Sequence, residues 1–179
     1  AMRWLIPRLP RFQAAHPGIE VRVVTAIGDL VELRPDWTAT IRLAESPGDG
    51  LAGEGLFTAA LFPVAAPAVA AQLKSPKDLT RQTLLEVNHA PQDWPRWLNA
   101  AGLDGRQFRR RASFDYSAFA LQAAVDGLGV ALARAPYVGD DLAAGRLTRL
   151  FDLALEEEKR GWYLIHRPGA EHDPPFRAF

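Results

Sequence analysis

The residues best suited to bind a ligand are Tyr116 and Ser117, which stand in front of an apolar segment with helical spacing. A serine at that position can cap the helix through its hydroxyl group. The hydroxyl and the free backbone amides of a first helical turn can instead bind an anion. Both interpretations stay open for Ser117. Tyr116 is either a surface aromatic residue or part of the wall of a binding site.

Two glycines, Gly127 and Gly129, follow the same segment. The apolar spacing of Ser117–Val125 predicts a buried crossover helix. Glycines that cradle a phosphate precede a helix, whereas these follow it. The pattern therefore predicts that Gly127 terminates the helix and that Gly129 lets the next strand turn back beneath it.

Two further residues are candidates for ligand contact. Thr25 ends a predicted strand, and ligands of open α/β sheets gather at the carboxyl ends of strands; the alternative role for Thr25 is a turn cap. Arg42 lies in another predicted strand. Its guanidinium suits a ligand carboxylate, but a structural salt bridge is the alternative.

Neither a catalytic set nor a metal site is evident. No two histidines have the spacing of metal ligands, no Gly-x-Ser-x-Gly elbow occurs, and nothing places two carboxylates for acid–base chemistry. The sequence predicts a protein that is not an enzyme and needs no cofactor. The histidines are His16, His89, His166 and His172.

Two charge runs have ordinary structural explanations. Arg109–Arg111 falls in a predicted strand, where side chains alternate between faces, so a solvated edge is expected. Glu156–Glu158, followed by Lys159 and Arg160, is expected to form a solvated loop.

The composition predicts one ordinary domain or two small lobes. The chain has 179 residues, 48% of them hydrophobic, with 21 basic and 21 acidic side chains and no cysteine. Balanced charge argues against a dedicated nucleic-acid binder. The sequence has neither a run long enough to span a bilayer nor a recognisable signal peptide, which, with the missing cysteine, favours the cytoplasm.

The predicted elements alternate between helices and strands. A helix is expected over residues 3–16, weakened by Pro7 and Pro10, and another after Asp93 as its cap. Ser75 is a possible cap with Pro76 behind it. Strands are expected at Ile19–Ala26, Thr38–Leu43, Leu56–Pro67 and Gly161–Pro168, with shorter ones between. The alternation predicts an α/β fold with a mostly parallel sheet in two lobes.

Several segments, in this order and spacing, resemble the effector-binding domain of LysR-type transcriptional regulators. They are WLIPRLPRFQAAHPGIEVRV, TIRLAE, LFPVAAPAVA, FDYSAFALQAAVDGLGVALARAPYVGDDLAAGRLTRLF and YLIHRP, and together they cover nearly the whole chain. The subgroup that they resemble contains the glycine-cleavage and β-lactamase activators.

The resemblance implies two Rossmann-like lobes in a type-2 periplasmic-binding-protein-like fold, with an effector cleft between them. Lobe I would comprise residues 1–66 and 164–179, and lobe II residues 67–163. Ser117 would lie at the lobe interface. Trp162 matches a position where an aromatic residue lines the cleft, although packing at the hinge is an equal alternative.

The resemblance also implies a small-molecule effector, a homodimer or homotetramer, and no membrane contact. DNA would be bound only through the family's N-terminal winged helix-turn-helix, which this sequence lacks, as it lacks the first strand; a fragment of a longer chain is therefore expected. Departures from the family pattern are Thr38 for Asp, Leu43-Ala44 for Tyr-Gly, and SPGDGLAGEG in place of the usual loop. The alternative function is a solute-binding protein of a transporter.

Overall fold

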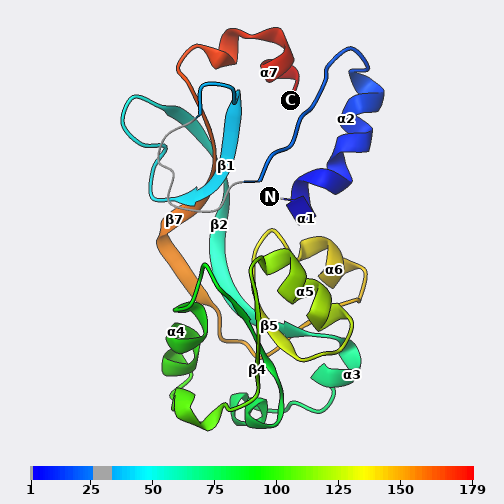
Figure 1. Cartoon of the computed structure of the whole chain (residues 1–179), viewed down its shortest axis with the longest axis vertical. Coiled ribbons are helices and arrows are strands. Elements are labelled where there is room, and N and C mark those ends of the chain that lie inside the picture. The colour runs from blue at the N-terminus through cyan, green and yellow to red at the C-terminus, as the bar shows by residue number, and fades with distance from the viewer. Residues whose placement is uncertain (1, 26–33) are drawn as a thin grey trace. The chain divides into compact units, whose positions relative to one another are not determined.

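The computed structural model describes residues 2–25 and 34–179, and it divides into two compact units (Figure 1). Unit 1 comprises Ala1–Ala59 and Glu158–Phe179, and unit 2 is the uninterrupted stretch Ala60–Glu157. Among the described residues, no helix is long and apolar enough to cross a membrane. Strands β2 (Ala52–Ala65) and β7 (Leu155–His166) carry the chain from one unit to the other.

Unit 1 begins with three short helical segments where one helix was expected. They are α1 (Met2–Leu5), the 3-10 helix η1 (Ile6–Arg8) and α2 (Leu9–Ala15). Pro7 and Pro10 each stand in the first turn of a new segment. A proline there needs no backbone hydrogen bond, whereas within a continuous helix it would break one. The two prolines therefore divide the helix.

The sheet of unit 1 is built on an antiparallel pair. β1 (Ala39–Ala44) pairs with Gly161–His166 of β7, and β7 lies between β1 and β2 in the strand order. The predicted strand at Ile19–Ala26 is wrong for Ile19–Thr25, which form no strand, and Ala26 lies outside the described residues. β-branched residues suit a strand, but a strand also requires a neighbour to pair with. Unit 1 ends in η4 (Ala170–His172) and α7 (Pro174–Ala178).

The sheet of unit 2 is mixed. β3 (Leu84–Val87) pairs in parallel with β4 (Arg111–Phe114) and with β5 (Val130–Arg134). β2 pairs antiparallel with β5 and with the short β6 (Thr148–Arg149). The prediction of a mostly parallel sheet is therefore wrong. The helices α4 (Asp93–Ala100) and α5 (Ser117–Val125) connect β3, β4 and β5, and such crossovers produce parallel neighbours.

Helices cover the strands of unit 2 (Figure 1). They are α3 (Pro67–Ala70), η2 (Pro76–Arg81), α4 (Asp93–Ala100), η3 (Gly105–Gln107), α5 (Ser117–Val125) and α6 (Gly139–Ala143). Ser75 forms a capping box with Asp78, which confirms the predicted cap. Asp93 is not a cap, because the N-cap of α4 is Gln92.

The helix α5 packs against the sheet on one side only. Ala120, Leu121 and Ala124 are buried in a core cluster, whereas Phe119 is 58% exposed, so the helix is not buried all round as expected. Gly127 adopts a φ of 82°, and Leu128 donates its amide hydrogen bond to Ala123. This left-handed terminator was predicted and is confirmed.

The arginine run is exposed at the edge strand β4, as expected, whereas the acidic run differs from expectation. β4 begins only at Arg111, so the arginine run does not lie on one strand; Arg109 and Arg110 are exposed, and Arg111 pairs with Glu86. The expected loop around Glu156–Glu158 is instead part of β7, with the side chain of Glu157 only 3% exposed. The β7 strand is therefore longer than the apolar pattern indicated.

Candidate functional site

The start of α5 leaves the hydroxyl of Ser117 available. Tyr116 is the N-cap residue, with extended backbone angles and no side-chain capping bond, and Ser117 is the first residue of the helix. The interpretation of Ser117 as a cap is therefore wrong. Its half-buried hydroxyl makes no hydrogen bond to any residue that the structure describes. It can donate to a ligand without losing a partner in the protein.

Polar residues from two neighbouring strands meet beside this helix terminus. β3 and β4 run parallel, so the residues that follow them lie at the same edge of the sheet. Asn88 donates a hydrogen bond to the carboxylate of Asp115 over 2.8 Å. His89 Nδ1 lies 2.8 Å from the carbonyl oxygen of Asp115. A carbonyl only accepts, so Nδ1 carries the proton and Nε2 remains for other contacts.

Tyr116 is anchored by the helix that it precedes. Its ring packs edge-to-face on Phe119, with 5.5 Å between centroids and 78° between planes. Its side chain is half-buried. Tyr116 and Ser117 therefore form, with Asn88, His89 and Asp115, a polar group at the carboxyl edge of the parallel strands of unit 2. Sequence reasoning missed the last three, although their position directly after a strand is a usable signal.

In unit 1, Arg42 and Trp162 lie on adjacent strands but face opposite sides. The β1–β7 register places Arg42 opposite Tyr163 and Leu43 opposite Trp162. Directly opposed residues share a face, and successive residues of a strand alternate faces. Arg42 therefore shares a face with Tyr163, and Trp162 with Leu43. Trp162 is 9% exposed and Arg42 is half-buried.

Thr25 lies in an irregular segment and is exposed. It is the last described residue before 26–33, and it does not end a strand as expected. The carboxyl-edge argument that made it a candidate therefore applies to Ser117 and not to Thr25.

A second polar group in unit 2 is held entirely by the protein's own charges. Arg134 binds both carboxylate oxygens of Asp93, over 2.6 and 2.7 Å. Glu157 Oε1 accepts from Arg134 over 3.3 Å and from Arg96 over 3.1 Å. Burial alone would raise the pKa of Glu157, but the charge of Arg134 and the bonds from both arginines bring that pKa below its ordinary value.

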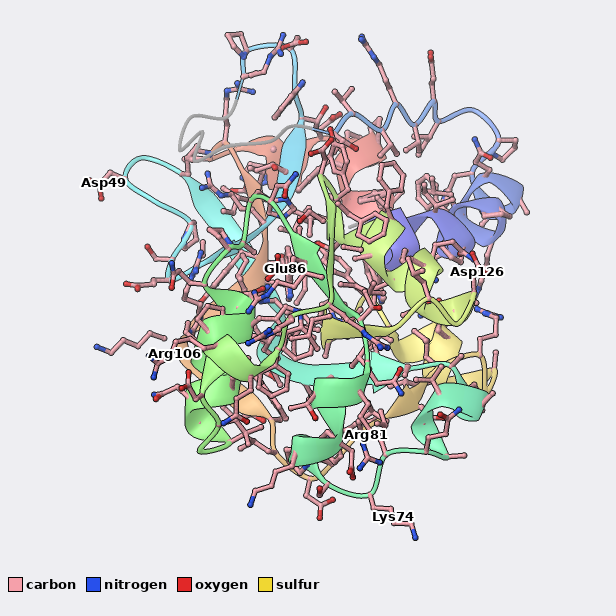
Figure 2. All side chains as sticks on the ribbon, turned by 60° about the horizontal axis from the view of Figure 1, so that its bottom comes forward. Asp49, Lys74, Arg81, Glu86, Arg106 and Asp126 are labelled. Atoms are coloured by element: carbon pink, nitrogen blue, oxygen red, sulfur yellow. The ribbon has the colours of Figure 1, made fainter. Side chains whose placement is uncertain are left out.

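A small hollow lies beside this cluster and includes Glu86 and Asp93 in its lining. Figure 2 labels Glu86 near the middle of the view and Lys74, which projects at its lower edge. Both carboxylates of the hollow are engaged, Glu86 by Arg111 and Asp93 by Arg134. Within residues 2–25 and 34–179, no group of three or more His, Asp or Glu side chains could hold a metal ion.

Comparison with known proteins places the whole chain in one family. A family model described as the LysR substrate binding domain matches residues 1–179. The chain is 33% identical over 174 residues to the glycine cleavage system transcriptional activator of Escherichia coli, covering 96% of this chain and 57% of that protein. It is 39% identical over 165 residues to the transcriptional activator AmpR of Pseudomonas aeruginosa, covering 92% and 54%. The chain thus spans just over half the length of these relatives.

Solved structures of effector domains resemble this chain as well. The effector domain of AmpR from Pseudomonas aeruginosa is 34% identical, with a TM-score of 0.73, covering 99% of this chain and 85% of that one. The AmpR effector-binding domain from Citrobacter freundii has a TM-score of 0.74 at 23% identity, covering 98% and 86%, which supports the shared fold. The α/β fold expected from the sequence is confirmed, and the chain belongs to the LysR substrate-binding domain family.

Proposed function

We propose that this chain is the effector-sensing and oligomerisation domain of a DNA-binding transcriptional regulator. The observation that supports the proposal most directly is the similarity of nearly the whole chain to curated transcriptional activators. In a full-length protein, a segment outside these 179 residues would contact DNA. The protein would act in the cytoplasm and would not catalyse a reaction.

The effector that we propose is a small molecule carrying a carboxylate or a similar anion. Ser117 offers a hydroxyl at the positive end of the α5 dipole, and an anion is stabilised at such a terminus. Tyr116 would contact the body of the same molecule. From unit 1 we propose Thr25, Arg42 and Trp162 as further contacts. Because Arg42 and Trp162 face opposite sides of their strand pair, they would contact different parts of the effector or act on it through their neighbours.

The mechanism that we propose is a population shift. An effector that binds one arrangement of the domain more tightly than the others stabilises that arrangement, in proportion to its difference in affinity between them. The regulator then presents its DNA-binding part differently. A ligand with equal affinity for both arrangements would bind without a regulatory effect.

We also propose that the domain associates with a second copy through α3 and α5. Phe119 and Leu128, on and just after α5, are 58% and 54% exposed. The exposed side chains of the alanine-rich stretches Ala68–Leu73 and Ala118–Ala124 would extend this surface. A symmetric pair would bury these apolar side chains on both copies at once. A homotetramer would need a second contact of a different kind.

Native mass spectrometry of the purified domain, followed by a thermal-shift screen of amino acids and cell-wall fragments, tests the effector proposal. An anionic compound that co-purifies or raises the melting temperature, and loses its effect in Ser117→Ala, supports it. A compound that is converted to a product during incubation would contradict the assignment as a sensor. The relatives described above are regulators, which does not favour the alternative of a transporter's solute-binding protein.

A further inference from the structure

Arg134 contacts both strands that leave unit 2. Its backbone pairs in register with Leu61 of β2. Its side chain reaches Glu157, the last residue of unit 2 on β7. Arg134 therefore contacts β2 through its backbone and the unit 2 end of β7 through its side chain, and its hydrogen bond to Glu157 adds to the backbone pairing of β7.

The guanidinium of arginine presents two forks of donors, one from the two Nη atoms and one from Nε with the adjacent Nη. The first fork of Arg134 is fully used, because Nη1 and Nη2 bind the two oxygens of Asp93. In the second fork, which Nε shares with Nη2, only Nη2 reaches Glu157, over 3.3 Å to Oε1. Arg134 Nε has no hydrogen-bond partner among the described residues. The side of the guanidinium that bears Nε is therefore incompletely bonded.

Glu157, in turn, has a buried acceptor without a hydrogen-bond donor among the described residues. Its side chain is 3% exposed, Oε1 accepts from Arg134 and Arg96, and the buried Oε2 accepts from no described residue. One residue thus has a spare donor and the residue bonded to it has a spare acceptor. Burying either atom without a partner is unfavourable, and most such atoms in proteins are bonded to the protein or to ordered water.

The charges of the cluster determine what can satisfy both atoms. Two guanidinium groups, Arg96 and Arg134, balance two carboxylates, Asp93 and Glu157. A cation would be repelled by the arginines and an anion by the carboxylates. The guest must therefore be neutral, small, and able to accept from one atom while donating to another. Water has these properties.

We propose that one water molecule is bound between Arg134 Nε and Glu157 Oε2. It accepts a hydrogen bond from Nε–H and donates one to Oε2, and so completes the contact between the two side chains. A bridging water is nearly as favourable in enthalpy as a direct bond, and it allows the two groups to stand further apart. The end of β7 in unit 2 is then held by one direct bond and one water-mediated bond to Arg134.

A crystal structure of the 179-residue domain at high resolution tests this site directly. The expected result is an ordered peak within hydrogen-bond distance of both Arg134 Nε and Glu157 Oε2. A direct Nε–Oε2 bond would overturn the proposal, and so would a structure in which no water lies within reach of both atoms.

A solution experiment removes any influence of the crystal. In the nitrogen-15-labelled domain, the Nε–H resonance of Arg134, assigned through its own side-chain carbons, should show a cross-peak at the water frequency with the sign of a long-lived contact. The Nε–H of Arg111 is the control, because it donates directly to the carbonyl oxygen of Phe108 and its side chain is only 37% exposed. Absence of the cross-peak for Arg134, or equal cross-peaks for both arginines, would count against a bound water.

Discussion

The carbonyl oxygen of Thr83 lies so close to Gly129 that a Cβ built on residue 129 would stand 2.1 Å from it. The amide of the next residue, Val130, donates to the same oxygen over 2.9 Å. The close approach therefore belongs to the hydrogen bonding that brings β5 alongside β3. Gly129 is needed here for space, whereas Gly127 is needed for its positive φ.

We expect Gly129→Ala to lower the free energy of unfolding by about 3 kcal/mol, because a backbone oxygen cannot move aside as a flexible side chain can. Urea unfolding followed by circular dichroism measures the change. Gly139→Ala is the control, since nothing lies within 4 Å of its Cβ position. It should change stability by less than about 1 kcal/mol. Equal stability of the two variants would contradict the steric argument.

Ser117→Ala should weaken binding of an anionic effector at least about tenfold, with little change in melting temperature. Losing a hydrogen bond to a charged group costs about 1.5–3 kcal/mol, and each 1.4 kcal/mol is about tenfold in affinity. No capping bond is lost, because the hydroxyl caps nothing. Calorimetric titration checks the affinity, with Ser113→Ala, an exposed serine on β4, as the control. Parental affinity in Ser117→Ala would remove Ser117 from the site.

Asp93→Ala should lower the free energy of unfolding by about 3 kcal/mol, because it leaves the largely buried Arg134 without its main counter-charge. Removing one partner of a buried pair costs more than the pair itself contributes. Asp152→Ala changes an exposed carboxylate of the same unit and should cost less than about 0.5 kcal/mol. Chemical denaturation at pH 7 measures the free energy of unfolding of both variants. A similar decrease in each would show that the Asp93–Arg134 pair is not critical for stability.

The stability that Glu157 contributes should depend on pH in a defined direction. Its pKa in the folded domain lies below the ordinary value of 4.5. The contribution is therefore complete above about pH 4.5 and is lost as the pH falls through the folded-state pKa. The stability difference between the parent and Glu157→Gln should thus be constant near neutrality and shrink below pH 4.5. Glu156→Gln, an exposed neighbour, should show almost no difference at any pH, and a Glu157→Gln deficit that grows in acid would refute this linkage.

Phe119→Asp should shift the domain towards the monomer at tens of micromolar concentration. The substitution places a charge in the centre of the exposed apolar surface of α5 while leaving the buried side of the helix unchanged. Asn99→Asp adds the same charge to an exposed position of α4 and should leave association unaltered. Sedimentation velocity distinguishes the two variants. A dimer that survives Phe119→Asp would place the interface elsewhere.

Elements with strong local signals could be predicted from the sequence. The bounds of α5 match because apolar spacing, a glycine terminator and a polar front all lie within about a dozen residues of each other. Pro7 and Pro10 predicted a weakened first helix, and the structure divides this helix into three segments. The strand expected at Ile19–Ala26 failed for the part described, because strand propensity cannot show whether a neighbouring strand is present to pair with it.

Charged clusters formed by distant residues could not be predicted. Asp93 has the residue type and position of a helix cap, but it binds Arg134, 41 residues away. Glu157 stands in a run of acidic residues that suggests a solvated loop. Its pairing with Arg134, 23 residues earlier, and with Arg96 explains its burial. The polar group of Asn88, His89 and Asp115 likewise depends on which two strands are neighbours. In each case, the contact can be identified only when the fold is known.

The division of the chain into one continuous unit and one interrupted unit has a consequence for folding during synthesis. Unit 2 can complete its sheet as soon as β7 reaches Glu157, because its other strands have by then left the ribosome. Unit 1 cannot, since β1 must wait for Gly161–His166 before it has the partner seen here. A strand that is translated before the whole of unit 2 is thus paired only after unit 2 is complete. A nascent chain stalled anywhere inside unit 2 would expose an unpaired β1 to chaperones or to other chains.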